Sequence, residues 1–197
     1  AFFSPAKSGV YMSILLRPVG LTENQVLHLT TMAAAAVSEA IEAVSGRKAD
    51  IKWVNDIFID GKKVCGILSE ASYGINTGKL EYAIVGIGIN AYEPAGGFPS
   101  SIAEIAGKVF DEPATGLKNR LAAEILNRFM AYYEHLPETP YSEEYIRRSV
   151  VTGKDVTVHK GSEMIRAHVL GIDQEFGLKV RYEDGSVEVL RSGEISI

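Results

Sequence analysis

The strongest constraint on the fold is a row of strand-like segments joined by turns too short to contain a helix. The segments are rich in branched apolar residues and lie near residues 49–54, 56–60, 63–73 and 80–91. Asp60-Gly61 is a tight-turn signal between two of them, and Asn76-Thr77-Gly78 marks a second hairpin. Parallel strands need a crossover of about a dozen residues or more, so these connections predict antiparallel neighbours.

Helical periodicity appears on both sides of this region. Residues 10–17 are apolar and branched, which predicts one more strand. Thr22 and Gln25 then form a capping-box pattern, apolar residues recur at helical spacing, and Gly46 is placed to end the helix. Further helices are predicted at about 115–135 and 142–149. The sequence therefore predicts an α+β protein with a mixed, largely antiparallel sheet packed by helices.

The pattern changes to short alternating strands after Gly153. Turn residues separate these strands at Lys160-Gly161, Glu175-Phe176-Gly177 and Asp184-Gly185. Five short strands in about 45 residues are typical of a small SH3-like barrel. We therefore expect one domain over residues 1–150 and a second, C-terminal domain over residues 151–197.

Composition narrows the class of protein. The chain has 197 residues and a formal net charge of -5, which gives no general case for nucleic-acid binding. It contains no apolar run of the roughly 18 residues needed to span a membrane. A single cysteine, Cys65, excludes an internal disulfide and fits a reducing cytoplasm. The abrupt start, with a core strand almost at once, suggests part of a longer polypeptide.

Glycines alternate with apolar residues in the last strand of the row. Strand side chains alternate, so Val85, Ile87 and Ile89 face one way while Gly86, Gly88 and Asn90 face the other. Such a bare face lets a flat ligand lie against the backbone, although it also permits close contact with another element. It is not a dinucleotide fingerprint, because the third glycine and the following helix are missing.

Charged residues follow two of the other strands. Asp56, beside Asn55 at the end of a strand, could hold Mg²⁺ next to a triphosphate or simply bond the backbone of a turn. Lys63 could neutralise two anions that must meet, or lie solvated at the end of a hairpin. Cys65 lacks a nearby histidine in sequence and is more typical of a packed strand residue than of a nucleophile.

Five segments together resemble biotin protein ligases, the biotin–[acetyl-CoA-carboxylase] ligases, over the whole chain. Lys52-Trp53-Val54-Asn55-Asp56 resembles the family's K-W-P-N-D, with Val54 in place of proline. The other matches are Lys63 to Glu70 with K-x-x-G-I-L-x-E, Gly86 to Asn90 with G-x-G-x-N, Phe2 to Pro5 with an aromatic F-S-P segment, and Ser192 to Ser196 with G-E-[IV]-S. Each segment is modest alone, but their order and spacing are specific.

The resemblance implies a class II synthetase-like catalytic core and assigns roles to the matching residues. Lys63 would be catalytic and would contact both the biotin carboxylate and the reacting phosphate. Biotin would bind against Lys63, Gly66, Leu68, Gly86 and Gly88. ATP would bind near Phe2, Lys52, Asn55, Asp56 and Asn90, with Asp56 also serving Mg²⁺.

The implied activity is a ligase that converts biotin and ATP to biotinyl-5'-adenylate and transfers biotin to a lysine of a carboxyl-carrier protein. The resemblance makes a homodimer plausible. A cytoplasmic location without membrane contact is expected from the single cysteine and from the absence of a long apolar run. The family's basic glycine-rich loop would lie upstream of Ala1, so these residues alone are expected to be catalytically incomplete. The alternatives are a lipoate or octanoate ligase or transferase, which would take a long straight acid, and a non-catalytic binding or regulatory module.

Overall fold

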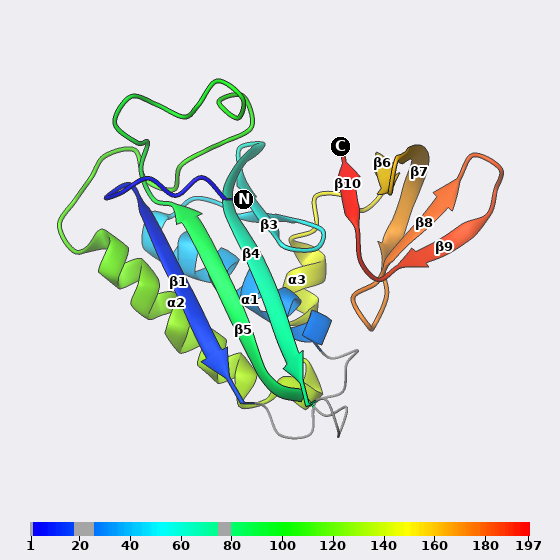
Figure 1. The fold of residues 1–197 in the computed structure, drawn as a ribbon, viewed down its shortest axis with the longest axis horizontal. Coiled ribbons are helices and arrows are strands. Elements are labelled where there is room, and N and C mark those ends of the chain that lie inside the picture. The colour runs from blue at the N-terminus through cyan, green and yellow to red at the C-terminus, as the bar shows by residue number, and fades with distance from the viewer. Residues whose placement is uncertain (1, 18–25, 75–79) are drawn as a thin grey trace.

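The computed structural model describes residues 2–17, 26–74 and 80–197 as two antiparallel sheets, the first of which is packed by helices (Figure 1). The first part of the chain contains β1 (Gly9–Leu16), α1 (Val26–Ser45), β2 (Asp50–Lys52), β3 (Asp56–Ile59), β4 (Lys62–Tyr73) and β5 (Leu80–Asn90). The remainder contains α2 (Leu117–Tyr133), the 3-10 helix η2 (Leu136–Glu138), α3 (Ser142–Arg147), β6 (Asp155–Lys160), β7 (Glu163–Ile172), β8 (Leu178–Tyr182), β9 (Val187–Leu190) and β10 (Glu194–Ser196). No helix in these ranges is long and apolar enough to cross a membrane.

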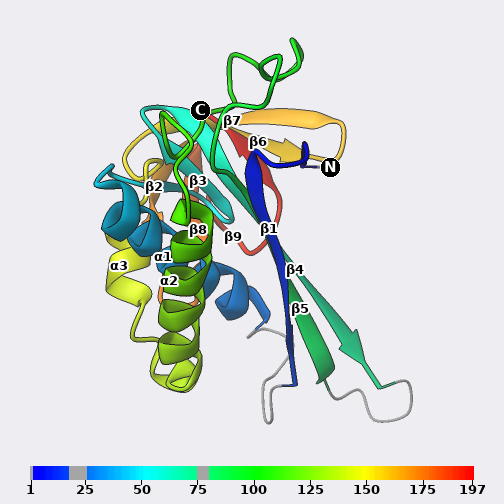
Figure 2. The same cartoon turned by 90° about the vertical axis from the view of Figure 1, so that its left-hand side faces the viewer.

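The first sheet has the strand order β1-β5-β4-β3-β2, and every neighbouring pair is antiparallel, as predicted. Asp60 and Gly61 both have positive φ and join β3 to β4, so the predicted tight turn is confirmed. The cap predicted at Thr22 and the hairpin predicted at Asn76-Thr77-Gly78 lie outside the described residues. Figure 2 shows α1, α2 and α3 on one side of the sheet, so its other face is open.

Helix α1 is the centre of the first hydrophobic core. Its residues Met32 to Val37 are fully buried, including the run of four alanines from Ala33 to Ala36. Small side chains let the helix lie close to the sheet on one side, while α2 packs on it from another. The predicted apolar stripe of α2 is confirmed, because Leu121, Ile125 and Phe129 are fully buried. The helical layer therefore covers one face of the sheet.

The second sheet has the strand order β10-β6-β7-β8-β9, again with antiparallel neighbours. Lys160 at the end of β6 contacts Glu188 on β9, with 2.6 Å between the ammonium nitrogen and Oε2. Two strands separate β6 from β9 in the sheet order, so this contact requires the sheet to curl. The curled sheet has its own hydrophobic core, whereas the SH3-like barrel and the boundary near residue 150 stay predictions.

The two cores exchange aromatic residues. Trp53, which follows β2, packs in the core of the second sheet. Phe176, from the β7–β8 turn of that second sheet, is fully buried in the first core and stacks on Tyr141 with 5.3 Å between ring centroids. The indole N–H of Trp53 donates to the carbonyl oxygen of Phe176 at 2.9 Å. The exchange ties the turn after β2 to both halves of the molecule.

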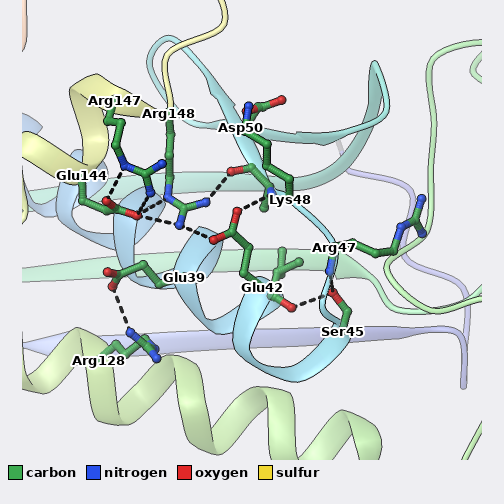
Figure 3. A network of polar contacts seen from close by, with 12 residues as sticks. Glu39, Glu42, Ser45, Arg47, Lys48, Asp50, Arg128, Glu144, Arg147 and Arg148 are labelled. Carbon is green, nitrogen blue, oxygen red and sulfur yellow. Dashed lines mark hydrogen bonds and ion pairs between the residues drawn. The ribbon is translucent and has the colours of Figure 1, made fainter.

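A buried arginine joins α1, α3 and the chain before β2 (Figure 3). The side chain of Arg148 is 2% exposed and donates to Glu42, Glu144 and the carbonyl oxygen of Ala49 at 2.6–2.7 Å. The hydrogen bond from Arg148 lowers the pKa of Glu42. The backbone of Arg148 also accepts a hydrogen bond from the Ile51 N–H at 2.8 Å. Arg148 therefore positions β2 from the outer edge of the sheet.

We expect Arg148→Ala to lower the free energy of unfolding by about 3 kcal/mol or more, because it leaves two partly buried carboxylates and a carbonyl without their donor. Chemical denaturation of the purified protein measures this change. Arg147→Ala is the matched control, since Arg147 also binds Glu144 but is 60% exposed. Its denaturation midpoint should move far less. Equal shifts for the two variants would contradict the role assigned to Arg148.

Candidate functional site

A cavity of about 1030 Å³ lies over the open face of the first sheet. It brings together every residue that the sequence predicted for the site except Lys52. The lining residues are Phe2, Phe3, Ser4, Tyr11, Met12, Ser13, Asn55, Asp56, Lys63, Gly66, Ile67, Leu68, Gly86, Ile87, Gly88, Asn90, Pro99, Ser101, Ile102, Ile105 and Ala106. Segments far apart in sequence thus converge on one face.

Glycines form a flat wall in this cavity. Gly66 on β4 lies directly opposite Gly88 on β5, and Leu68 lies opposite Gly86. Val85, Ile87 and Ile89 are buried against the helices, so the predicted alternation of the two faces is confirmed. The ring of Phe2 covers part of the wall: a Cβ added at Gly88 would lie 2.8 Å from the Cδ1 atom of Phe2.

The two glycines of β5 therefore differ in their surroundings. At Gly86 an added Cβ would meet only the carbonyl oxygen of Leu68, at an ordinary contact distance of 3.6 Å. Close packing with the ring of Phe2, which lies in neither a strand nor a helix, occupies the space where a side chain at Gly88 would lie. It does not account for the absence of a side chain at Gly86, which leaves open space.

An ion pair stands at one end of the wall. Asp56 and Lys63 lie on adjacent strands, with 2.5 Å between Oδ1 of Asp56 and the ammonium nitrogen of Lys63. Both side chains are partly exposed to the cavity. Asp56 lies opposite Gly66 in the β3–β4 ladder, which sets the charge pair beside the flat wall. A cation and a carboxylate are thus available where a charged end of a ligand would lie.

One sequence prediction about this region was wrong. Asp56 was placed at the end of a strand, but β2 ends at Lys52 and Asp56 begins β3. The chain has to turn between them because Trp53 leaves the sheet for the second core. The peptide bond between Trp53 and Val54 is cis.

Asn55 and Lys52 have different places from the ones expected. The side-chain amide of Asn55 donates to the carbonyl oxygen of Ile67 at 2.7 Å, and the Ile67 N–H donates back to the Asn55 carbonyl at 3.0 Å. Asn55 therefore closes the turn onto β4 as well as lining the cavity. Lys52 pairs with Asp56 across β2 and β3, but among the described residues it does not line the cavity.

Among the cavity residues that sequence reasoning missed are two that face the glycine wall from β1, and a loop. Tyr11 and Ser13 lie directly opposite Gly88 and Gly86 on the neighbouring strand and line the cavity. The alternation within residues 10–17 placed both on one face and was a usable signal. Residues 99–106, which close one side of the cavity, gave no periodic signal.

Cys65 does not belong to the cavity. Its side chain is fully buried on the helix side of β4. Burial raises the pKa of the Cys65 thiol well above its usual range, and the charge of Asp56 raises it further. A thiol in this environment is protonated and sheltered, which agrees with a packing role.

The comparisons with known proteins point to one family. The family model described as "Biotin/lipoate A/B protein ligase family" matches residues 1–90. A biotin–[acetyl-CoA-carboxylase] ligase of Paracoccus denitrificans is 30% identical over 195 residues, which cover 93% of this chain and 78% of that protein. The chain belongs to the biotin protein ligase family.

Other members of the biotin protein ligase family are similar over the same residues. A bifunctional ligase/repressor BirA of Bacillus spizizenii is 30% identical over 196 residues; the match spans 96% of this chain and 58% of that protein. The crystal structure of the biotin protein ligase of Aquifex aeolicus has a TM-score of 0.77 and 26% identity, covering 96% of this chain and 81% of that one. The same ligase in complex with biotin and ATP has a TM-score of 0.72 and 27% identity, covering 96% and 78%.

We expect Cys65 in the native protein to react with a small aromatic disulfide at least about 100-fold more slowly than in denaturant, because the thiol is buried and protonated. The absorbance of the released thiolate at pH 8 measures both rates. The denatured protein is the internal control for reagent access. Rapid stoichiometric labelling of the native protein would show that Cys65 is a reactive thiol and would contradict its packing role.

Proposed function

We propose that the protein activates biotin with ATP and transfers biotin to a lysine of a carboxyl-carrier protein. The single observation that carries the proposal is the convergence of a flat glycine wall and the Asp56–Lys63 ion pair in one cavity. Membership of the biotin protein ligase family, with a similar structure that binds biotin and ATP, supports it. The chain spans 58% of the length of the Bacillus relatives, so the activity of the whole protein is part of the proposal.

The proposed reaction has two steps. A carboxylate oxygen of biotin attacks the α-phosphorus of ATP, the bond to the bridging oxygen breaks, and pyrophosphate leaves with the electron pair. The product is a mixed anhydride, biotinyl-5'-adenylate. The neutral ε-amine of a carrier lysine then attacks the acyl carbon, an amide forms, AMP leaves, and the amine loses a proton. Such chemistry needs positioning and charge neutralisation more than covalent catalysis.

Lys63 is the residue we assign to charge neutralisation. The biotin carboxylate and the α-phosphate are both anions, and their approach is opposed in a poorly solvated cavity. The Lys63 ammonium lies at the charged end of the glycine wall, where it can contact both groups. Asp56 holds that ammonium at the cavity in the absence of substrate.

Biotin would lie along the glycine wall formed by Gly66, Gly86 and Gly88. Its rings are compact and need close approach to the backbone rather than a deep tunnel. Leu68 is exposed on the same face and supplies apolar contact. To the residues predicted from the sequence we add Ser13, whose position opposite Gly86 brings a hydroxyl to the wall.

ATP would occupy the end of the cavity near Asn90 and Phe2. Asn90 is almost buried at the end of β5, which suits hydrogen bonding to a base rather than to solvent. Phe2 offers an aromatic face. Asp56 supplies a single carboxylate, and the described residues contain no cluster of three metal-binding side chains. Mg²⁺ would therefore fit here only if phosphate oxygens of the nucleotide supplied further ligands. When bound there with the phosphates, the ion would neutralise their charge.

The second candidate is a lipoate or octanoate ligase, which the description of the matching family model also covers. Octanoate is a straight chain, whereas biotin is bicyclic. The open sheet face continues past the glycines to Leu15 and Tyr82, where such a chain has apolar contact. Comparing biotin and octanoate as acids in the same activation assay distinguishes the two functions.

In the full-length protein, Lys63→Ala should slow biotin-dependent pyrophosphate release by about 10²–10³-fold, because a preorganised charged donor is lost. The variant should keep its fold, since Lys63 is partly exposed. Lys48→Ala, which removes an exposed lysine paired with Asp50 outside the cavity, is the control and should keep the wild-type rate. A folded Lys63→Ala protein with a near-normal rate of pyrophosphate release would contradict the role assigned to Lys63.

Gly88→Val should weaken biotin binding at least about tenfold, because the new side chain fills the ligand face and displaces the ring of Phe2. Thermal stability should change little, since valine suits a strand and Phe2 can move. Calorimetric titration with biotin and thermal unfolding measure the two effects. Gly86→Ala is the comparison, because its Cβ meets only an ordinary contact within the protein, so a loss of affinity at this position does not come from displacement of Phe2. Retained affinity together with loss of folding would identify Gly88 as a packing glycine.

A further inference from the structure

The segment from Ile105 to Phe110, which we call the strap, continues the sheet where β5 ends. Regular pairing of β4 with β5 begins at Cys65 and leaves Lys63 without a β5 partner. The strap takes that place: the Lys63 N–H donates to the carbonyl oxygen of Ile105 at 2.7 Å, and the Gly107 N–H donates to the carbonyl oxygen of Lys63 at 2.8 Å. Lys63 and Ala106 thus form a parallel bridge.

The same strap also holds the end of β5. The Val109 N–H donates to the carbonyl oxygen of Asn90 at 2.9 Å, and the Phe110 N–H donates to that of Ala91 at 2.9 Å. One short segment therefore bonds the backbones of Lys63 and Asn90. Lys63 is assigned to the reacting carboxylate and phosphate, and Asn90 is assigned to the base of ATP.

The strap is anchored away from the cavity. Val109 is fully buried and Phe110 nearly so, both in the first core. Arg47, at the end of α1, donates to the carbonyl oxygens of Lys108 and Val109 at 3.1 and 3.2 Å and pairs with Asp60 at 2.7 Å. The strap is therefore part of the packed structure and can act as a fixed support.

Gly107 is a point where the strap lies close against β4. A Cβ added there would lie 2.7 Å from Cβ of Lys62 and 3.2 Å from Cγ1 of Val64. Both atoms are close to the backbone of β4, so neither can move away as the far end of a flexible chain would. The φ of Gly107 is not positive, so space rather than backbone conformation requires glycine.

We propose that the strap is a positioning element that sets Lys63 relative to Asn90, and that Gly107 makes its close approach to β4 feasible. This inference rests on the proposed function for its effect on rate, but not for its effect on structure. A misplacement of about 1 Å at a reacting group can cost on the order of 100-fold in rate. Any side chain at Gly107 should act through Lys63 in this way.

The test uses Gly107→Ala in the full-length protein. We expect the kcat for biotin-dependent pyrophosphate release to fall about 10–100-fold, while the KM for biotin changes less, because the glycine wall remains intact. Glu104→Ala is the matched control, since it changes a neighbouring side chain but keeps the carbonyl oxygen that Lys62 contacts. Glu104→Ala should retain the wild-type kcat.

Rescue separates positioning from a general structural defect. Lys62→Gly removes the atom nearest to the new Cβ, so the double variant Lys62→Gly/Gly107→Ala should recover to within about threefold of Lys62→Gly alone. Absence of rescue would overturn the inference. If Gly107→Ala does not fold, the double variant decides the question in the same way: it folds and works if the contact with Lys62 is the cause.

Amide hydrogen exchange gives a readout that does not depend on activity. Protection of the Lys63 N–H, which donates to Ile105, should fall in Gly107→Ala and return in the double variant. Unchanged protection and unchanged kcat would overturn the role of the strap while the proposed function stands. A wild-type protein that releases no pyrophosphate with biotin would instead overturn the proposed function, and the exchange result would still test the strap.

Discussion

The turn between β2 and β3 is held by contacts from both hydrophobic cores, and the position of Asp56 depends on it. Trp53 packs in the second core and donates its indole N–H to Phe176, while Phe176 packs in the first core. Tyr145 is in edge contact with Phe176, and its hydroxyl donates to the carbonyl oxygen of Val54 at 3.0 Å. These contacts surround the turn and connect it to both cores. The turn therefore cannot shift unless the packing of one core is disrupted. The second sheet thus shapes the cavity although all the described residues that line it come from the first part of the chain.

The glycine wall and the Asp56–Lys63 ion pair are positioned by different parts of the structure. The glycine wall lies within long, regular strands, where the ladder alone sets its geometry. Asp56 and Lys63 lie where regularity ends: one follows the turn, and the other lies beyond the last β4–β5 pair, next to a bulge in the β3–β4 ladder. Their separation is therefore set by non-local contacts with Trp53 and the strap. Substitutions far from the cavity should accordingly affect the charged end more than the wall.

Periodic patterns in the sequence predicted much of this structure. Features that follow no sequence period were not predicted. The apolar stripe of α2 and the two faces of β5 repeat at fixed intervals, so the sequence alone was sufficient. Phe176 lies in a turn that was correctly expected, but no repeat shows that an aromatic ring in a turn enters the core of the other half of the chain. The strap, with Gly107 close against β4, has the same character: its bonds join segments distant in sequence. Asp56 was misplaced because no feature of the sequence shows that the strand ends at Lys52, where Trp53 leaves the sheet for the second core.

Gly86 is the residue at which two explanations of a glycine, close packing and ligand binding, can be distinguished. Glycine inside a strand costs about 0.5–1 kcal/mol relative to alanine and adds nothing to the core. The other face of β5 is filled by Val85 and Ile87, so the fold does not need a bare position here. At Gly88 the ring of Phe2 explains the missing side chain, but at Gly86 the space above the backbone is open. A side chain at Gly86 would fit the unliganded protein. We therefore propose that glycine is needed at Gly86 for a molecule that lies flat on this strand, between Ser13 and Leu68 on the neighbouring strands.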